Sequence, residues 1–103
     1  MIRNGEDKRR RLRSLAKIFR RRLVETGWES NDFDSPIVPI VIGDEGETLI
    51  LRDRLLENGI LVGAVRPPTV PRGTARLRVS LHSEVTESQI DEFFDVLRQW
   101  INR

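Results

Sequence analysis

Arginines gathered around a proline-rich stretch are the side chains in this sequence best suited to chemistry. Between residues 66 and 81, three prolines fall within five positions. Proline fixes φ and removes a backbone donor, so a stiff loop is predicted. Guanidinium groups bind carboxylates and phosphates through paired hydrogen bonds of fixed geometry, so this loop suits a small anion. The alternative is an ordinary solvated turn. The residues concerned are Arg66, Pro67, Pro68, Pro71, Arg72, Arg76 and Arg78.

A strand is predicted directly after this loop, starting at Ala75. Gly73 permits the sharp turn that leads into it. From there the side chains alternate between apolar and polar, which is the period of a strand with one buried face. Two arginines therefore share the polar face, which is left for solvent or for an interface. The apolar set is Ala75, Leu77, Val79 and Leu81, and the polar set is Arg76, Arg78 and Ser80.

Most other kinds of site are disfavoured by residues that the sequence lacks. Without cysteine there is no disulfide, thiolate nucleophile or zinc–thiolate site. The single histidine, His82, excludes a His-pair metal motif and is interpreted as an ordinary residue at a strand end. Lys8 and Lys17 are the only lysines, both amid positive charge and without a visible pocket. Neither is predicted to be a nucleophile, and no catalytic or metal-binding residue is predicted in this chain.

The 103 residues are predicted to form one domain, because the length leaves no room for a second. Apolar spacing predicts a basic amphipathic helix within residues 1–27 and a βαββα unit over residues 35–103, with a polar connector over residues 28–36. The predicted fold class is α+β, with a small three-stranded sheet and helices on one face in the order α-β-α-β-β-α. The predicted elements are helix 7–26, strand 37–42, helix 46–58, strand 60–65, strand 75–81 and a last helix over residues 86–101.

Each predicted helix carries an apolar stripe that should face the sheet. In the first helix, arginines and one lysine occupy the other faces, Arg20 among them. Thr86 and Gln89 form a capping box at the start of the last helix. Pro39 interrupts the first strand, which favours an edge position. The stripes are Leu12, Leu15, Phe19 and Leu23; then Leu49, Leu55 and Leu56; and last Ile90, Phe93, Phe94, Leu97, Trp100 and Ile101.

Charge is distributed unevenly along the chain, although the net charge is only +2. Residues 1–22 carry ten Lys or Arg against two acids, and the rest carries eight basic and fourteen acidic residues. This asymmetry makes nucleic acid a candidate partner of the first helix. The helix lacks a recognition-helix context, a zinc site and interleaved aromatic residues, which favours a solvated or partner-facing role instead. No apolar run approaches about 18 residues and no secretion signal is visible, so a cytoplasmic location is expected.

Three motifs resemble the C-terminal segment of the 8-amino-7-oxononanoate synthases, which are α-oxoamine synthases of the fold-type-I aminotransferase superfamily. They are the segment Ser35-Pro36-Ile37-Val38-Pro39-Ile40, the pair Gly43-Asp44, and the run from Arg66 to Arg78. The resemblance covers essentially the whole chain but only about the last quarter of the family's length. The proline-rich part followed by Gly-Thr-Ala-Arg-Leu-Arg is hard to obtain by chance. Val85 departs from the family, whose members usually carry histidine at that position.

The resemblance implies a small C-terminal domain that closes over an active site built mainly by a large domain. It implies that Arg78 binds the amino-acid carboxylate, and that Arg66 and Thr69 lie at the substrate site on a mobile loop. The implied reaction is the decarboxylative condensation of L-alanine with a pimeloyl thioester in biotin synthesis. The lysine that binds pyridoxal phosphate and the groups around the cofactor ring belong to the large domain. This chain alone is therefore expected to bind no cofactor and to be inactive.

Several alternatives stay open. Other α-oxoamine synthases, namely 2-amino-3-ketobutyrate ligase, 5-aminolevulinate synthase and serine palmitoyltransferase, are rivals because acyl-chain choice depends on residues outside this segment. A non-enzymatic binding module that uses the basic helix, and an inactive remnant that self-associates through an apolar, arginine-rich interface, are further classes. The expected partners are the large catalytic domain and a carboxylate substrate, with a homodimeric parent and neither nucleic acid nor membrane. Since Met1 opens a segment that is interior in the family, a split gene, a truncated reading frame and an isolated domain are the expected origins.

Overall fold

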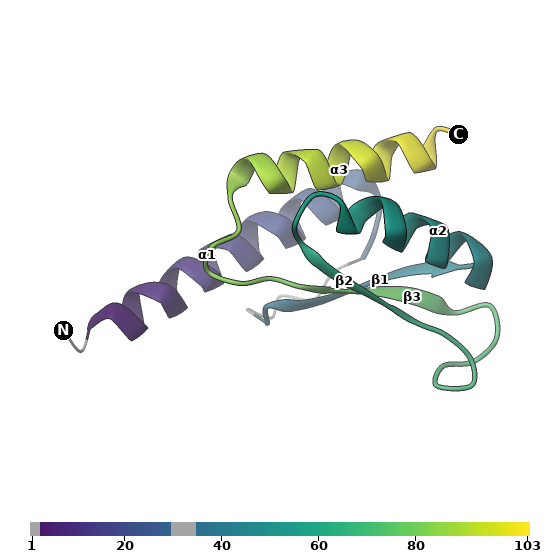
Figure 1. Ribbon diagram of the computed structural model, residues 1–103, viewed down its shortest axis with the longest axis horizontal. Helices are drawn as coiled ribbons and strands as arrows, with labels where there is room; N and C mark the ends of the chain where they lie inside the picture. Colours follow the sequence, from purple (N-terminus) through teal and green to yellow (C-terminus); the bar gives the residue numbers. More distant parts are fainter. Residues whose placement is uncertain (1–2, 30–34) are drawn as a thin grey trace.

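A computed structural model of the chain describes residues 3–29 and 35–103, with side chains from Glu6 onward. The middle of the predicted connector, residues 30–34, lies outside the described residues. The elements follow the predicted order α-β-α-β-β-α (Figure 1). They are α1 (Arg3–Thr26), β1 (Ile37–Gly43), α2 (Glu45–Leu56), β2 (Leu61–Val65), β3 (Ala75–Ser80) and α3 (Glu87–Ile101).

The three strands form one sheet in the order β1-β3-β2. Strand β3 lies in the centre and is antiparallel to both neighbours, with Arg78 paired to Pro39 of β1 and to Gly63 of β2. Strand β1 is therefore an edge strand, as Pro39 predicts, since proline cannot donate to a second neighbour.

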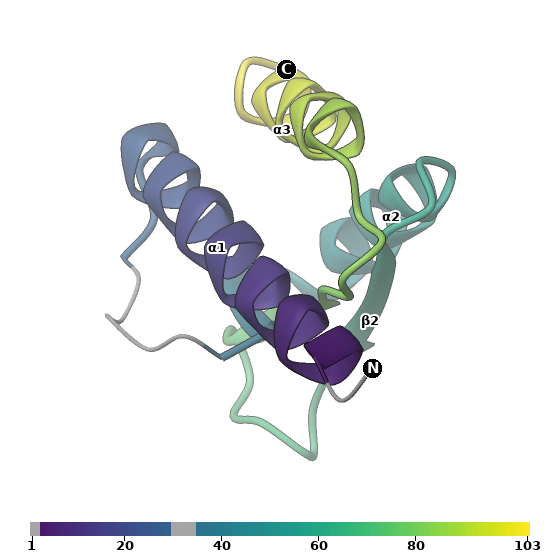
Figure 2. The same ribbon diagram turned by 90° about the vertical axis from the view of Figure 1, so that its left-hand side faces the viewer.

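All three helices cover the same face of the sheet, which confirms the predicted α+β layer (Figures 1 and 2). The alternation along each strand decides which side chains point toward the helices. On the helix side, Val38, Ile40, Leu77 and Val79 are fully buried. On the other side, no helix of the described chain covers the strands. We call this second side the open face; it carries Ile37, Pro39, Val41, Leu61, Gly63, Val65, Arg76, Arg78 and Ser80.

Aromatic rings join α1 to α3 over the centre of the core. The ring of Phe19 lies 5.0 Å from that of Phe93 and 4.9 Å from that of Phe94 between centroids, and all three side chains are fully buried. Helix α3 begins at the predicted capping box: the Thr86 hydroxyl accepts a hydrogen bond from the Gln89 backbone N–H, and the Gln89 side chain accepts one from the Thr86 N–H.

Apart from shifts of one or two residues at the ends of other elements, four details differ from the sequence-based predictions. Helix α1 begins at Arg3 rather than at residue 7. In α2 the buried apolar residues are Leu51 and Leu55, while the predicted Leu56 is 43% exposed because it falls off the face that Leu55 presents to the sheet. At the end of α3, Ile101 extends past the core and is 40% exposed. The fourth is Arg20, which is buried and is described with the site below.

Candidate functional site

The proline-rich loop, residues 66–74, joins β2 to β3 at one end of the sheet and extends away from the helices (Figure 2). It is built from two tight turns. The Thr69 N–H donates to the Arg66 carbonyl over 3.0 Å, and the Thr74 N–H donates to the Pro71 carbonyl over 3.1 Å. Gly73 has φ of +79°, so the predicted sharp turn before β3 does use the conformation that favours glycine.

A cavity of about 620 Å³ separates this loop from the start of α2. The loop returns close to β1 at its base, since a Cβ at Gly43 would lie 3.4 Å from the Gly73 carbonyl oxygen. On the α2 side, the Asp44 carboxylate caps the helix by accepting the Glu47 N–H over 2.8 Å. The cavity is lined by Gly43, Asp44, Glu45, Pro67, Pro68, Arg72 and Gly73.

Arg66 bends toward the start of α2. Its Nη1 donates to Oε1 of Glu45 over 3.3 Å, and both side chains are about half exposed. Thr69 is exposed at the end of the same turn. Within the described residues its hydroxyl has no hydrogen-bond partner, so it is available to a ligand.

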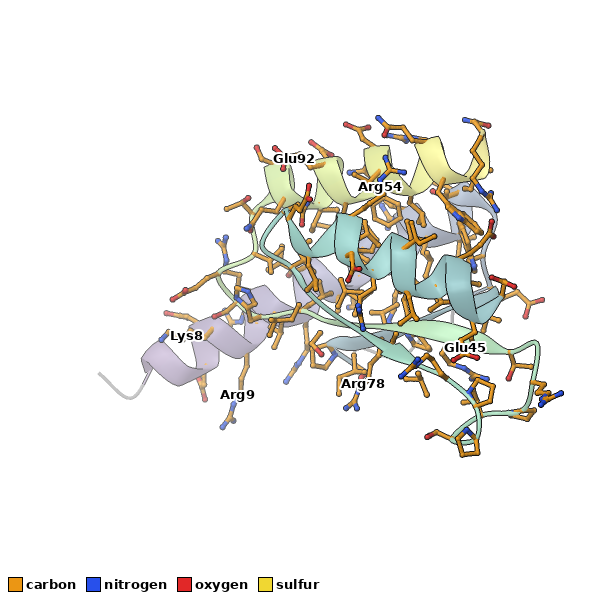
Figure 3. The ribbon with its side chains drawn as sticks, turned by 45° about the vertical axis from the view of Figure 1, so that its right-hand side comes forward. Lys8, Arg9, Glu45, Arg54, Arg78 and Glu92 are labelled. Atoms are coloured by element: carbon orange, nitrogen blue, oxygen red, sulfur yellow. The ribbon has the colours of Figure 1, made fainter. Side chains whose placement is uncertain are left out.

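Arg78 occupies the middle of the open face. Its side chain points away from the helices and is exposed (Figure 3). None of the ion pairs and hydrogen bonds among the described residues involves its guanidinium. Beside it, Gly63 leaves open space where a Cβ would stand. The apolar side chains on the same face are 40% exposed at Ile37, 48% at Val41 and 62% at Leu61, so a cation stands among exposed apolar groups.

The structure brings two of the three predicted site residues together and leaves the third apart. Arg66 and Thr69 share one hydrogen-bonded turn. Arg78 lies on the open face, whereas Arg66 pairs with Glu45 at the start of α2; Figure 3 labels Arg78 and Glu45. Two guanidiniums converging on one anion are therefore not found in this arrangement. For Arg66 to meet an anion held by Arg78, it must leave Glu45.

Sequence reasoning missed a second polar site at the edge of β1. Arg20 was expected on a solvated face of α1, yet it is only 8% exposed and donates to the carbonyls of Ser35 over 3.2 Å and Ile37 over 3.1 Å. The signal was present in the spacing, because Arg20 lies four residues after Ala16 and three before Leu23, both in the core. Trp28 also contacts this edge, since its indole N–H donates to the Val41 carbonyl over 2.9 Å. A cavity of about 370 Å³ here is lined by Arg20, Gly27, Trp28, Glu29, Pro39, Val41 and Arg76.

Lysine, the residue that holds pyridoxal phosphate covalently, occurs in this chain only on α1, so the described residues do not fit that cofactor. Lys8 and Lys17, the only lysines of the sequence, both lie on α1 and are exposed. His82 is exposed between β3 and α3, as expected for a residue at a strand end. In the described ranges no three His, Asp or Glu side chains gather around a point where a metal could bind, and no helix there has the length and apolarity to cross a membrane.

Comparison with known proteins gives consistent matches over almost the whole chain. Residues 1–97 match the family described as aminotransferase class I and II. An 8-amino-7-oxononanoate synthase of Thioalkalivibrio sulfidiphilus is 51% identical over 94 residues, which are 90% of this chain and 24% of that protein. The enzyme of the same name from Pseudomonas syringae pv. tomato is 42% identical over 99 residues, or 96% of this chain and 25% of that protein. The chain thus spans about a quarter of the length of these relatives.

Solved structures match in the same way. The 8-amino-7-oxononanoate synthase of Francisella tularensis superposes with a TM-score of 0.78 at 31% identity, covering 93% of this chain and 28% of that one. A structure described as SPT with PLP has a TM-score of 0.76 at 32% identity, with 89% of this chain and 24% of that chain covered. A Sphingomonas wittichii serine palmitoyltransferase has a TM-score of 0.74 at 28% identity, covering 87% of this chain and 23% of that chain.

Proposed function

The chain belongs to the aminotransferase class I and II family, and from that membership we propose that it is the C-terminal, substrate-carboxylate-binding domain of an 8-amino-7-oxononanoate synthase. The proposed reaction of the complete enzyme is the condensation of L-alanine with a pimeloyl thioester, with loss of carbon dioxide. In the proposed enzyme this chain supplies binding groups, and a larger domain supplies the catalytic ones. Its proposed location is the cytoplasm.

The observation that carries the proposal is the open face with Arg78 at its centre. A sheet face bearing Ile37, Val41 and Leu61 in solvent leaves apolar area uncovered, and such patches on soluble proteins mark interfaces. The matched relatives are about four times as long as the aligned segment, so most of their chain has no counterpart here. We propose that this missing part, the large domain, packs over the open face. Arg78 would then be enclosed at the boundary between two domains.

Enclosure changes what Arg78 can do. A guanidinium in open water gains little from a carboxylate, because both groups are well solvated. Once a second domain excludes water, a paired charge-assisted hydrogen bond contributes about 1.5–3 kcal/mol. The amino-acid carboxylate is the proposed partner, since Arg78 has no acid beside it within the described part of the chain.

Arg66 and Thr69 are proposed to complete the site from the loop. Both lie on one turn that extends from the sheet end, so a single movement of that turn would displace both side chains together. Arg66 would exchange the Glu45 carboxylate for a substrate carboxylate, and the exchange costs little because the Arg66–Glu45 pair is half exposed. Thr69 would add a hydroxyl donor to the same anion.

The cofactor is proposed to lie wholly on the other domain. In the complete enzyme, pyridoxal phosphate would supply the carbanion stabilisation that the condensation needs. No lysine of this chain is placed to bind it, since Lys8 and Lys17 lie on α1. The chain alone is therefore proposed to be inactive, and the complete enzyme is proposed to be a homodimer.

Complementation tests this proposal. The chain would be mixed with the Thioalkalivibrio sulfidiphilus synthase truncated of its matching segment, and coenzyme A release would be measured with L-alanine and pimeloyl-CoA. We expect neither part to be active alone and the mixture to be active. Failure of the wild-type chain to restore activity, while the relative's own segment does restore it, would contradict the proposal.

Arginine variants then test the assigned roles. Arg78→Ala is expected to raise the KM for L-alanine by about 10- to 100-fold, which corresponds to the loss of one charge-assisted interaction. Arg66→Ala and Thr69→Ala should show smaller increases. The matched control is Arg98→Ala, which removes an exposed arginine that is paired with Asp95 on α3, far from the open face. Equal effects of Arg78→Ala and Arg98→Ala would remove Arg78 from the site.

A second candidate within the same family has specific support. The two serine palmitoyltransferase structures named above superpose on this chain almost as well as the oxononanoate synthase does, with TM-scores of 0.76 and 0.74 against 0.78. The domain could bind the carboxylate of serine or glycine in the same way as that of L-alanine. Replacing L-alanine with each of these in the same assay distinguishes the candidates, and a KM for serine or glycine below that for L-alanine would favour the second.

A further inference from the structure

One charged surface of α1 has no part in the proposed function. Seven basic side chains of this helix are exposed, and among the described residues none of them forms an ion pair; Arg11 alone donates to a backbone carbonyl outside the helix, that of Ser83. Figure 1 shows that the first half of α1 extends beyond the sheet, and in Figure 3 Lys8 and Arg9 point away from the body. Four of the seven side chains follow the spacing i, i+3, i+7 and i+11 and share one side of the helix, which we call the basic face of α1; it consists of Arg10, Arg13, Lys17 and Arg21.

A surface of opposite charge lies on α3. Its residues follow the helical spacing i, i+4, i+5 and i+8, so they form one exposed row on the side turned away from the sheet. Figure 3 shows Glu92 pointing outward from this helix. We call this surface the acidic face of α3; it consists of Glu87, Asp91, Glu92 and Asp95.

We propose that the basic face of α1 on one copy of this chain binds the acidic face of α3 on a second copy. The two rows match in length: Arg10 to Arg21 rises about 16 Å and Glu87 to Asp95 about 12 Å at 1.5 Å per residue. Both rows also repeat at the spacing of helical turns, so two helices lying side by side bring several opposite charges together. Where α1 and α3 meet within one chain, Arg22 of α1 does pair with Asp91 of α3.

A second copy fits this surface better than nucleic acid does. The acidic face has a matching spacing and is present at the same concentration as the basic face, whereas α1 offers no exposed aromatic side chain for stacking bases. A net charge of only +2 opposes association of two copies weakly. Because the two faces differ, the contact is head-to-tail, and each added copy leaves one face of each kind open.

Sedimentation at two ionic strengths tests the proposal. Exposed ion pairs are weak and are screened over about 30 Å at 0.01 M salt but about 3 Å at 1 M salt. We expect the weight-average mass to rise with protein concentration above 12.0 kDa at the low ionic strength and to return to 12.0 kDa at the high one. Association that persists at high salt would instead indicate that the copies associate through the apolar open face, and it would overturn the proposal. So would a chain that stays monomeric at low salt while binding a duplex oligonucleotide.

Charge reversal tests which faces are used. The triple variant Arg10→Glu, Lys17→Glu, Arg21→Glu and the double variant Glu87→Lys, Glu92→Lys should each remain monomeric at low salt. All five positions are exposed, so the substitutions should leave the fold intact, which circular dichroism checks. Self-association of either variant at the wild-type level would contradict the proposal.

The matched control for the double variant is Asp53→Lys, Glu57→Lys on α2, which changes two exposed acids outside the acidic face. Both double variants have the same net charge, but the control keeps both faces and should associate at low salt as the wild-type chain does. Equal behaviour of the two double variants would show that net charge, rather than these two faces, controls the contact.

Discussion

The two faces of the sheet use the same strands in different ways. On β3, Leu77 and Val79 are fully buried under the helices, while Arg78 between them stands exposed on the open face. The helix-covered side joins α1, α3 and all three strands in one apolar cluster. On the open face, the described residues contribute no comparable cluster, and Ile37, Val41 and Leu61 there are 40–62% exposed.

The difference indicates a division of labour. Hydrophobic burial is the main favourable term in folding, so the helix-covered side should supply most of the stability. Exposed side chains on the open face contribute little to the free energy of unfolding. Substituting them should therefore leave the stability of the fold unchanged, and this face can carry binding groups. Substitutions on the two sides should therefore separate into those that change stability and those that change recognition.

The largest expected effect is on the helix-covered side. Phe93→Ala should lower the free energy of unfolding by about 3–5 kcal/mol, because it removes ring contacts to both Phe19 and Phe94 and leaves a cavity. Urea denaturation followed by circular dichroism measures the change. The control on the open face is Leu61→Ala, which should cost less than about 1 kcal/mol at 62% exposure. Similar losses in the free energy of unfolding for the two variants would show that the two faces of the sheet do not differ in their contribution to stability.

A smaller but clear effect is expected at the edge of the sheet, where Arg20 bridges α1 to β1. Arg20→Ala should cost about 1.5–3 kcal/mol, since a charged donor to the Ser35 and Ile37 carbonyls is lost. Its neighbour Arg21 is exposed, so Arg21→Ala should change the free energy of unfolding by less than about 0.5 kcal/mol. An equal, small change for both would mean that the Arg20 contacts do not stabilise the fold.

The fold was predictable because its elements are marked locally. Periodicity, the capping box at Thr86 and the glycines that follow helices identified all six elements to within a few residues, and Pro39 identified an edge strand. Details that depend on packing angle were not predictable in this way. Leu51 and Leu56 are equally apolar in sequence, but only the direction of α2 relative to the sheet decides that Leu51 is buried and Leu56 is not.

The site was less predictable than the fold. Sequence places Arg66, Thr69 and Arg78 near one loop, and the turn that joins Arg66 to Thr69 was foreseeable from the prolines. The direction of a long, flexible side chain was not, because it depends on a partner such as Glu45 from a distant part of the sequence. The burial of Arg20 likewise depends on carbonyl groups of β1 that only the fold brings near.

The capping box gives an intermediate effect. Thr86→Ala should cost about 1 kcal/mol, because the Gln89 N–H at the start of α3 loses its acceptor. Thr86→Ser keeps the hydroxyl and should restore most of that loss, as measured by urea denaturation. If serine and alanine behave alike, the cost comes from something other than the cap.

The smallest expected effect on stability belongs to Arg78. Arg78→Ala should change the free energy of unfolding of the isolated chain by less than about 0.5 kcal/mol, because the guanidinium is exposed and no partner for it exists in the described part of the chain. Among the site variants, the same substitution should give the largest rise in KM for L-alanine in the complementation assay. Arg78→Ala would thus have the smallest effect on stability and the largest effect on substrate binding. Arg78→Lys separates charge from geometry: it keeps the charge but loses the paired hydrogen bonds, and its KM should fall between those of wild type and Arg78→Ala.

A stability loss above about 1 kcal/mol for Arg78→Ala would exceed the range of ordinary surface substitutions. Such a loss would mean that the open face contributes to stability as well as to binding. The assignment of stability to the helix-covered side and of binding to the open face would then be wrong at Arg78, the residue in the middle of that face.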